Sequence, residues 1–263
     1  MIKTAVSGSS GFIGTHLCNL LGRYEKLDRK GNLPDKVDVI FDLAAYGNLA
    51  GHKGSAKMIY NANTQRVAKI LTELIKRKEK GEDIKYIYMS TSSVSLPYQT
   101  FYSASKKATE EMIKIAVRDY GIKATIVRPY TVIGPREHVQ HLIPTIMNSC
   151  IWGHEMPFVE NPVHDFVDVR DVAKALVLIS KKAKFNGEVY EVGSGKQMNN
   201  KKILNIVEKT LKMKANTKLV NSVRKYDTNK WRANTYRIKK LGWKPEISIE
   251  QSINDMVHYF LPL

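Results

Sequence analysis

The sequence has little cysteine, few acidic side chains and no long apolar run. Two cysteines, Cys18 and Cys150, cannot form a disulfide framework or a cysteine-only metal site, and so low a count is typical of a reducing compartment. No apolar run approaches the roughly 20 residues that a membrane-spanning helix needs. Glycine and serine follow the first strand-like residues too early for a signal peptide, so we expect a cytoplasmic protein that does not cross a membrane.

The scarcity of acidic residues makes the chain strongly basic, with 25 Asp and Glu against 42 Lys and Arg and a net charge of +17. Residues 194–240 alone contain 14 basic and 2 acidic side chains. Such a surplus indicates an anionic ligand, either nucleic acid or a phosphorylated metabolite. A diphosphate needs only one or two of these cations, so we expect most of the lysines to lie on solvated surfaces.

The 263 residues are enough for one large α/β domain with a small lobe attached. Short β-rich runs alternate with longer runs of helical period, which favours a parallel sheet with helices on both faces. Expected strands are 3–7, 37–43, 85–90, 123–129 and 188–192, and expected helices are 14–23, 56–77, 103–120 and 169–180. The proline and glycine residues of 133–162 predict a loop-rich segment there.

A glycine-rich loop, Gly8-Ser9-Ser10-Gly11-Phe12-Ile13-Gly14, lies between the first strand and the first helix. In that position Gly8 permits a tight turn, Gly11 lets the backbone approach a pyrophosphate, and Gly14 lets the helix pack against the sheet. The helix N-terminus then offers its N–H groups to the phosphates. The pattern predicts a dinucleotide site on a doubly wound sheet, the Rossmann fold.

The residues that would distinguish NAD from NADP lie where the second strand of a dinucleotide-binding sheet is usually found. Asp28 could hold the ribose hydroxyls of NAD, whereas Arg29 beside it could meet the 2′-phosphate of NADP. The sequence leaves the two cofactors open.

A tyrosine and a lysine four residues apart, Tyr102 and Lys106, lie on one face of an expected helix. A fixed ammonium should lower the pKa of the phenol toward neutrality, as general-base catalysis at pH 7 requires. Upstream, the hydroxyls of residues 90–93 follow an apolar strand and should reach the carboxyl edge of the sheet, where ligands bind in such folds.

Together these residues resemble the extended short-chain dehydrogenase/reductases, the NAD-dependent epimerases, dehydratases and reductases of nucleotide sugars. The resemblance spans nearly the whole chain. It rests on the glycine loop and on Asp42-Leu43-Ala44-Ala45, Asn63, Tyr102-Ser103-Ala104-Ser105-Lys106, residues 128–135, residues 164–173, residues 187–193 and Leu241-Gly242-Trp243-Lys244-Pro245.

The resemblance implies a catalytic group of Thr91, Tyr102 and Lys106. Tyr102 would exchange a proton with a sugar hydroxyl or ketone, Thr91 would hydrogen-bond the same oxygen, and Lys106 would tune Tyr102 and hold the nicotinamide ribose. The implied cofactor residues are Gly8, Gly11, Phe12, Ile13, Gly14, Asp28, Arg29, Leu43, Ala44, Ala45, Asn63, Lys106 and Pro129. The implied substrate residues are Ser92, Ser93, Thr131 and Arg224.

The chain also departs from the family pattern. Ser92 and Ser93 stand where dehydratases carry acidic residues, which disfavours a dehydratase and leaves an epimerase or a ketoreductase. The segments between Thr91 and Tyr102 and after Asp28 are short, and His164 replaces the usual arginine before Asp-Phe, so the substrate stays undetermined.

We therefore expect an NAD- or NADP-dependent enzyme acting on a nucleotide sugar. A reductase of a non-sugar carbonyl and a non-catalytic NAD(P)- or nucleic-acid-binding protein on the same fold remain alternatives. Residues 1–132 and 163–193 would form the dinucleotide-binding domain, and residues 133–162 and 194–263 the substrate-binding lobe. The resemblance also implies a homodimer packed through helices. We expect no metal, because the spacing of His138 and His141 lacks a third ligand, and no nucleic-acid partner.

Overall fold

The computed structural model describes residues 2–49, 56–221 and 224–260. Its main sheet has six strands, all parallel, in the order β2-β1-β3-β4-β5-β9. They are β1 (Thr4–Ser7), β2 (Glu25–Lys26), β3 (Val39–Asp42), β4 (Lys85–Met89), β5 (Lys123–Pro129) and β9 (Asn186–Val192). The five predicted strands are all present. The two-residue edge strand β2 is an addition, because a pair of exposed charged residues carries no apolar pattern.

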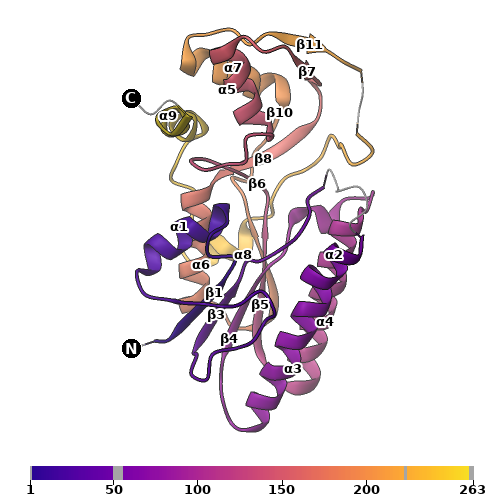
Figure 1. Ribbon diagram of the computed structural model, residues 1–263, viewed down its shortest axis with the longest axis vertical. Coiled ribbons are helices and arrows are strands. Elements are labelled where there is room, and N and C mark those ends of the chain that lie inside the picture. Colours follow the sequence, from indigo (N-terminus) through magenta and orange to yellow (C-terminus); the bar gives the residue numbers. More distant parts are fainter. Residues whose placement is uncertain (1, 50–55, 222–223, 261–263) are drawn as a thin grey trace.

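Helices cover both faces of this sheet (Figure 1). One face carries α1 (Phe12–Leu21) and α6 (Val169–Lys182), and the other carries α2 (Ala56–Tyr60), α3 (Arg66–Glu79) and α4 (Phe101–Tyr120). Successive strand residues point to opposite faces, so Ile40 packs in the core under α3 and α4 while Phe41 packs in the core under α1 and α6. This arrangement confirms the predicted doubly wound α/β fold.

The helix predicted over 56–77 is interrupted by a π-helical turn at Asn61–Gln65. Such turns often occur at functional sites. Asn63 lies inside it with its side chain buried against the sheet edge, so the irregularity coincides with a polar residue that the tertiary structure needs in place.

A second unit lies above the carboxyl edge of the main sheet (Figure 1) and has its own apolar core. It is joined to the main sheet through β6 (Thr131–Ile133) and β8 (Val163–Asp168), which pair in a small sheet of order β10-β8-β6. Its other elements are α5 (Leu142–Trp152), β7 (Met156–Phe158), β10 (Gln197–Asn199), α7 (Asn200–Leu211), β11 (Thr217–Leu219) and α9 (Ile249–Phe260).

Two sequence predictions about the lobe need correction. Residues 133–162 are not simply loop-rich, since they contain the eleven-residue helix α5. Pro144 lies in the first turn of α5, where its missing N–H costs nothing. The segment around α8 (Tyr236–Lys240) was predicted to belong to the lobe, but its residues Ile238 and Trp243 pack in the core of the main domain under α6. The Trp243 indole also donates a hydrogen bond to the carbonyl of Asp171 at 3.0 Å.

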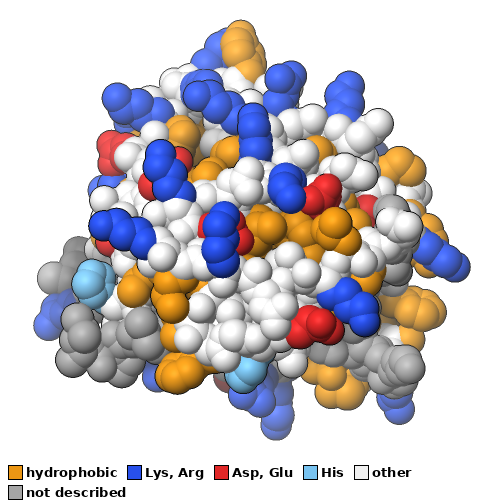
Figure 2. Space-filling model, turned by 90° about the horizontal axis from the view of Figure 1, so that it is seen from above, with side chains coloured by type: hydrophobic (Ala, Val, Ile, Leu, Met, Phe, Trp, Pro, Cys, Tyr) orange, Lys and Arg blue, Asp and Glu red, His pale blue; other side chains and the backbone are white. Residues whose placement is uncertain are grey.

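On the face of the lobe seen in Figure 2, Lys and Arg side chains lie dispersed among hydrophobic and other side chains. A stripe is the expected footprint of a nucleic-acid surface. Both cysteines are buried and free. Across the described ranges, no helix has the length and apolar character needed to cross a membrane.

Candidate active site

The glycine loop has the geometry of a phosphate cradle. Gly8 has φ of +65°, and a Cβ on it would lie 2.9 Å from the Ala44 nitrogen. A Cβ on Gly14 would lie 2.0 Å from the Gly8 carbonyl oxygen, so neither position tolerates a side chain. No side chain of the described residues caps α1, which leaves the N–H groups of Phe12, Ile13 and Gly14 for an anion.

A buried carboxylate supports this cradle from below. Asp42, at the end of β3, accepts hydrogen bonds from Ser7 Oγ, from Tyr86 Oη at 2.6 Å and from Arg66 Nη2 at 2.8 Å. Ser7 Oγ in turn accepts the Ala44 N–H at 3.0 Å. Burial opposes the charge of Asp42, but the Arg66 guanidinium and the hydroxyls outweigh it and lower its pKa. Asp42 thus fixes the loop that contains Leu43, Ala44 and Ala45 beside Gly8.

The predicted cofactor residue Asn63 acts in the structure as a brace for that loop. Its Oδ1 accepts the Tyr46 N–H at 2.8 Å, and its Nδ2 donates to the Tyr46 carbonyl at 3.0 Å and to Ser105 Oγ at 3.1 Å. These bonds tie the loop after β3 to α4. Asn63 therefore positions the cradle relative to the helix that carries Tyr102.

Asp28 and Arg29 lie exposed just after β2, at the same edge of the sheet as the glycine loop. The Asp28 carboxylate accepts the Asn32 backbone N–H at 2.9 Å and the Asn32 side-chain amide at 2.6 Å. The backbone N–H of Asn32 is the main cause of a lowered pKa of Asp28. Asp28 and Arg29 stay candidates for contact with the adenosine ribose. Pro129 is buried at the end of β5, on the opposite side of β4, and stays a candidate for contact with the cofactor.

Thr91 and Tyr102 meet at the carboxyl end of β4. Thr91 precedes the 3-10 turn η2 (Ser92–Ser95), and its Oγ1 accepts the Ser93 N–H at 3.2 Å and lies 3.0 Å from Ser93 Oγ. Tyr102 lies in the first turn of α4, which Thr100 caps. The Thr91 hydroxyl lies near the Tyr102 phenol and acts to lower its pKa. The tertiary structure thus brings together the two hydroxyls that the sequence predicted to act as a pair.

Lys106 is buried beneath this pair and does not lower the pKa of Tyr102. Its Nζ donates to the Met89 carbonyl at 2.6 Å and lies 4.4 Å from the centre of the Tyr88 ring. Burial lowers the pKa of Lys106 to about 7. Burial also raises the pKa of Tyr102 to about 12, against the opposing hydrogen bond from Thr91. The expectation of a phenol tuned toward neutrality is wrong for this structure, because the ammonium faces a main-chain carbonyl.

The depressed pKa of Lys106 predicts a pH-dependent stability. Between about pH 7 and the ordinary lysine pKa of about 10.4, the unfolded chain binds this proton and the folded chain does not, so the free energy of unfolding rises with pH. Relative to a Lys106→Met variant, the wild type should gain on the order of 2 kcal/mol between pH 7 and pH 9. Urea unfolding at both pH values measures it, with the exposed neighbour Lys107→Met as control. An identical pH response in wild type and Lys106→Met would contradict this assignment.

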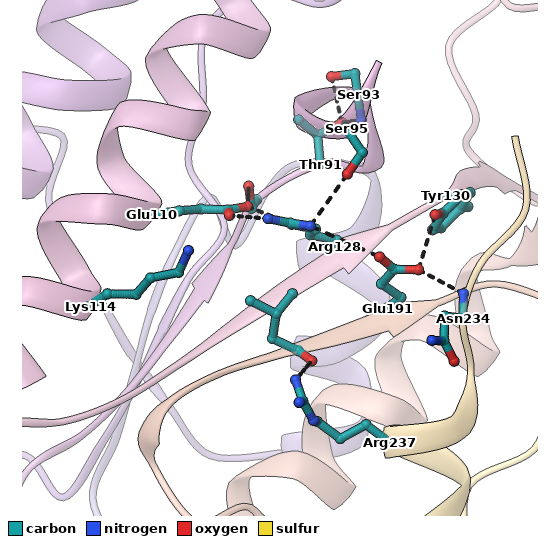
Figure 3. Close-up of polar contacts among 12 residues, drawn as sticks. Thr91, Ser93, Ser95, Glu110, Lys114, Arg128, Tyr130, Glu191, Asn234 and Arg237 are labelled. Atoms are coloured by element: carbon teal, nitrogen blue, oxygen red, sulfur yellow. Dashed lines mark hydrogen bonds and ion pairs between the residues drawn. The ribbon is translucent and has the colours of Figure 1, made fainter. Parts of the chain in front are cut away.

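A buried ion pair fixes α4 against the sheet (Figure 3). Glu110, one turn beyond Lys106, is fully buried and accepts bonds from Arg128 Nε at 2.9 Å, from Arg128 Nη2 at 2.5 Å and from Ser90 Oγ. Arg128 Nη1 reaches Ser95 Oγ at 3.3 Å. One guanidinium therefore connects the helix of Tyr102 to the turn that follows Thr91.

The remaining predicted substrate residues form two groups. Ser92 and Ser93 are buried in η2 beside Thr91. Thr131 Oγ1 lies 3.3 Å from His164 Nδ1, and burial followed by the nearby Arg224 guanidinium lowers the pKa of His164 to about 4. Arg224 is exposed and pairs with Asp227 at 3.4 Å. His164 is therefore neutral at pH 7, and Arg224 carries the positive charge of the second group.

The sequence reasoning assigned no supporting role to four residues: Asp42 and Arg66 under the cradle, and Glu110 and Arg128 behind Thr91. A signal existed for two of them. Asp42 is the carboxylate that ends an otherwise apolar strand, and Glu110 lies one helical turn after Lys106 on the same face. As for metals, the described part of the chain contains no group of three or more His, Cys, Asp or Glu side chains placed to hold an ion.

Comparisons with known proteins agree with this geometry. An uncharacterised UDP-glucose epimerase of Bacillus subtilis is 21% identical over 100% of this chain and 99% of its own length. The UDP-glucuronic acid 4-epimerase of Bacillus cereus, solved with UDP-glucuronic acid and NAD, superposes with a TM-score of 0.86 at 19% identity, covering 98% of each chain. A Pseudomonas aeruginosa protein, RMD, solved with NADPH gives 0.84 at 21% identity, covering 99% of each chain. A family model matches residues 25–193, and the chain belongs to the NAD dependent epimerase/dehydratase family.

Proposed function

We propose that the protein is an NAD- or NADP-dependent epimerase or ketoreductase of a nucleotide-activated sugar. The observation that carries this proposal is that the hydroxyls of Thr91 and Tyr102 lie near each other at the carboxyl end of β4, beside a glycine cradle that admits no side chain at Gly8 or Gly14. Ligands of doubly wound sheets bind at this edge.

The residues of the cradle fit a dinucleotide. The pyrophosphate would lie on the uncapped N-terminus of α1, against Gly11, and the adenosine ribose would lie near Asp28. The bound cofactor supplies the hydride donor or acceptor. The nicotinamide end would then lie toward Thr91, since β4 is two strands from β1 in the sheet.

The chain's own residues handle the proton. Tyr102 is protonated at pH 7, because burial holds its pKa at about 12, so it can donate to the oxygen of a ketone as that oxygen gains charge. Thr91 donates to or accepts from the same oxygen and orients it. The protonated phenol favours ketoreduction as the direction in which the free site is ready, and an epimerase would also need Tyr102 to take a proton back.

A dehydration needs a further acid and base next to the hydroxyl pair. Ser92 and Ser93 occupy these positions, and neither side chain has a carboxyl group. We therefore place the protein with the epimerases and reductases.

Arg224 would hold the diphosphate of the substrate. Replacing it with alanine should weaken binding of a nucleotide sugar by about tenfold or more, because a charge-assisted hydrogen bond contributes about 1.5–3 kcal/mol. Calorimetric titration of wild type and Arg224→Ala with the same nucleotide sugar measures the effect, and Lys225→Ala is the neighbouring control. An unchanged affinity would remove Arg224 from the site and favour a non-sugar carbonyl substrate.

The experiment that tests the function is to denature the purified protein and identify any released nicotinamide nucleotide by chromatography and mass. Tightly held NAD would support an epimerase, which regenerates its cofactor in every cycle. An empty site that fills reversibly with NADH or NADPH would support a reductase. A protein that neither contains nor binds any of these nucleotides would overturn the proposal.

We further propose a homodimer, packed through α2 and α4. These helices expose large apolar side chains, with Phe101 at 73%, Tyr60 at 55%, Met58 at 54% and Ile115 at 45% exposure. Exposed apolar side chains gathered on neighbouring helices are typical of an interaction surface.

A further inference from the structure

A cavity of about 790 Å³ lies on the side of Thr91 away from the glycine loop. Its wall includes Ser92 and Ser95 of η2, which follows β4, then Tyr130, which follows β5, and Ser194, which follows β9. These are the carboxyl ends of the three strands opposite the dinucleotide half of the sheet. Thr91 and Tyr102 do not line the cavity, but Ser92, the neighbour of Thr91 in the chain, does, so the cavity begins one residue from the reacting pair.

Hydrogen bonds fix the inner wall of the cavity (Figure 3). Glu191 accepts the Tyr130 hydroxyl at 3.0 Å and the Asn234 N–H at 2.6 Å, and its other oxygen lies 3.9 Å from Arg128 Nη1. Arg128 also reaches Ser95. A second carboxylate, Asp165, accepts the N–H groups of Ser194, Gly195 and Ala233 behind the same wall. Both carboxylates are thus engaged by donors of the protein, and neither is part of the cavity lining.

The outer wall is strongly positive. Four basic side chains line the cavity, and no acidic residue is among its described lining residues. Within the described ranges, none of the four forms an ion pair with a carboxylate. The four are Lys196, Lys230, Arg232 and Lys239. Like charges gathered around a concave surface raise the local concentration of an anion.

We propose that this cavity receives the glycosyl end of the substrate and that this end carries a carboxylate, as in a hexuronic acid. This inference rests on the proposed function. Arg224 pairs with Asp227 and does not line the cavity. The diphosphate of the substrate would therefore bind Arg224, and a different group of the substrate would contact the cavity cations. A neutral sugar would leave the four cations without a counter-charge, whereas a carboxylate provides one.

The test compares two ligands that differ only in that carboxylate. Calorimetric titration of the intact protein with UDP-glucuronic acid and with UDP-glucose should show the acidic sugar binding about tenfold or more tightly, and the difference should shrink at high salt. The combined variant Lys196→Gln, Arg232→Gln and Lys239→Gln should abolish most of this preference, lowering the affinity for UDP-glucuronic acid much more than the affinity for UDP-glucose. A charge-matched control is Lys202→Gln, Lys209→Gln and Lys218→Gln, three exposed lobe lysines outside the cavity.

The outcomes separate this inference from the proposed function. Equal affinity for the two sugars overturns the inference and leaves the function standing. Equal weakening of both sugars and of UDP by the cavity variant means that the cavity holds the diphosphate, which also overturns it. If neither UDP-sugar binds, the protein is titrated with the same acidic and neutral sugars as their dTDP and GDP derivatives. Failure of all three pairs overturns the proposed function and this inference with it. Circular dichroism verifies that each variant is folded.

Discussion

Replacing Tyr102 with phenylalanine is expected to lower kcat by about 10²- to 10⁴-fold, the range that a positioned proton donor contributes. The variant keeps the ring that packs near Gly47 in the loop after β3 and loses only the hydroxyl that lies near Thr91. Cofactor affinity should stay nearly unchanged, because the cradle around Gly8 and Gly14 makes no use of Tyr102. Steady-state kinetics and a cofactor titration on the same preparation measure both quantities.

The matched control for this variant is Tyr98→Phe. Tyr98 lies between Thr91 and Tyr102 in the chain but is 43% exposed, so its hydroxyl should not affect turnover. If Tyr102→Phe retained wild-type turnover, the catalytic assignment would be wrong and another group would have to supply the proton. If both variants lost activity equally, the loss would reflect the shape of the segment and not proton transfer.

Replacing Glu110 with alanine is expected to lower the free energy of unfolding by about 3–5 kcal/mol, because it removes the hydrogen-bonded counter-charge of the partly buried Arg128 guanidinium and leaves it only Glu191, 3.9 Å away. The side chains of the pair are 1% and 19% exposed. Chemical denaturation at neutral pH measures the effect. The loss should include activity, since Arg128 also holds Ser95 in the turn that follows Thr91.

A double variant makes this second prediction specific. Glu110→Leu combined with Arg128→Met removes both charges and should be less destabilising than Glu110→Ala alone, since the guanidinium is no longer buried without Glu110 and Glu191 keeps the bonds from Tyr130 and Asn234. Strictly additive losses would show that the two side chains do not act as a pair. In that case the network drawn in Figure 3 would not fix α4 to the sheet.

The sequence by itself determined the fold class and the place of the chemistry. Glycine at positions 8 and 14 is required by backbone contacts in the loop, and short apolar runs alternating with runs of helical period predicted the parallel sheet and its helices. The position of residues 90–93 after an apolar strand predicted hydroxyls at the carboxyl edge of the sheet. The pairing of Thr91 with Tyr102 came from the resemblance to the family.

Only the tertiary structure decided what surrounds those residues. The four-residue spacing placed Lys106 on the face of Tyr102, but it could not show that the ammonium turns to the Met89 carbonyl and that both pKa values follow burial. Glu110 and Arg128 are 18 residues apart in sequence, and no local pattern encodes their contact. The positive cavity is likewise built from three strand ends and the segment 230–239. Desolvation and ion pairing depend on neighbours that folding brings from elsewhere in the chain. For that reason the sequence predicted where the site lies, whereas the pKa values and ion pairs of its residues followed only from the tertiary structure.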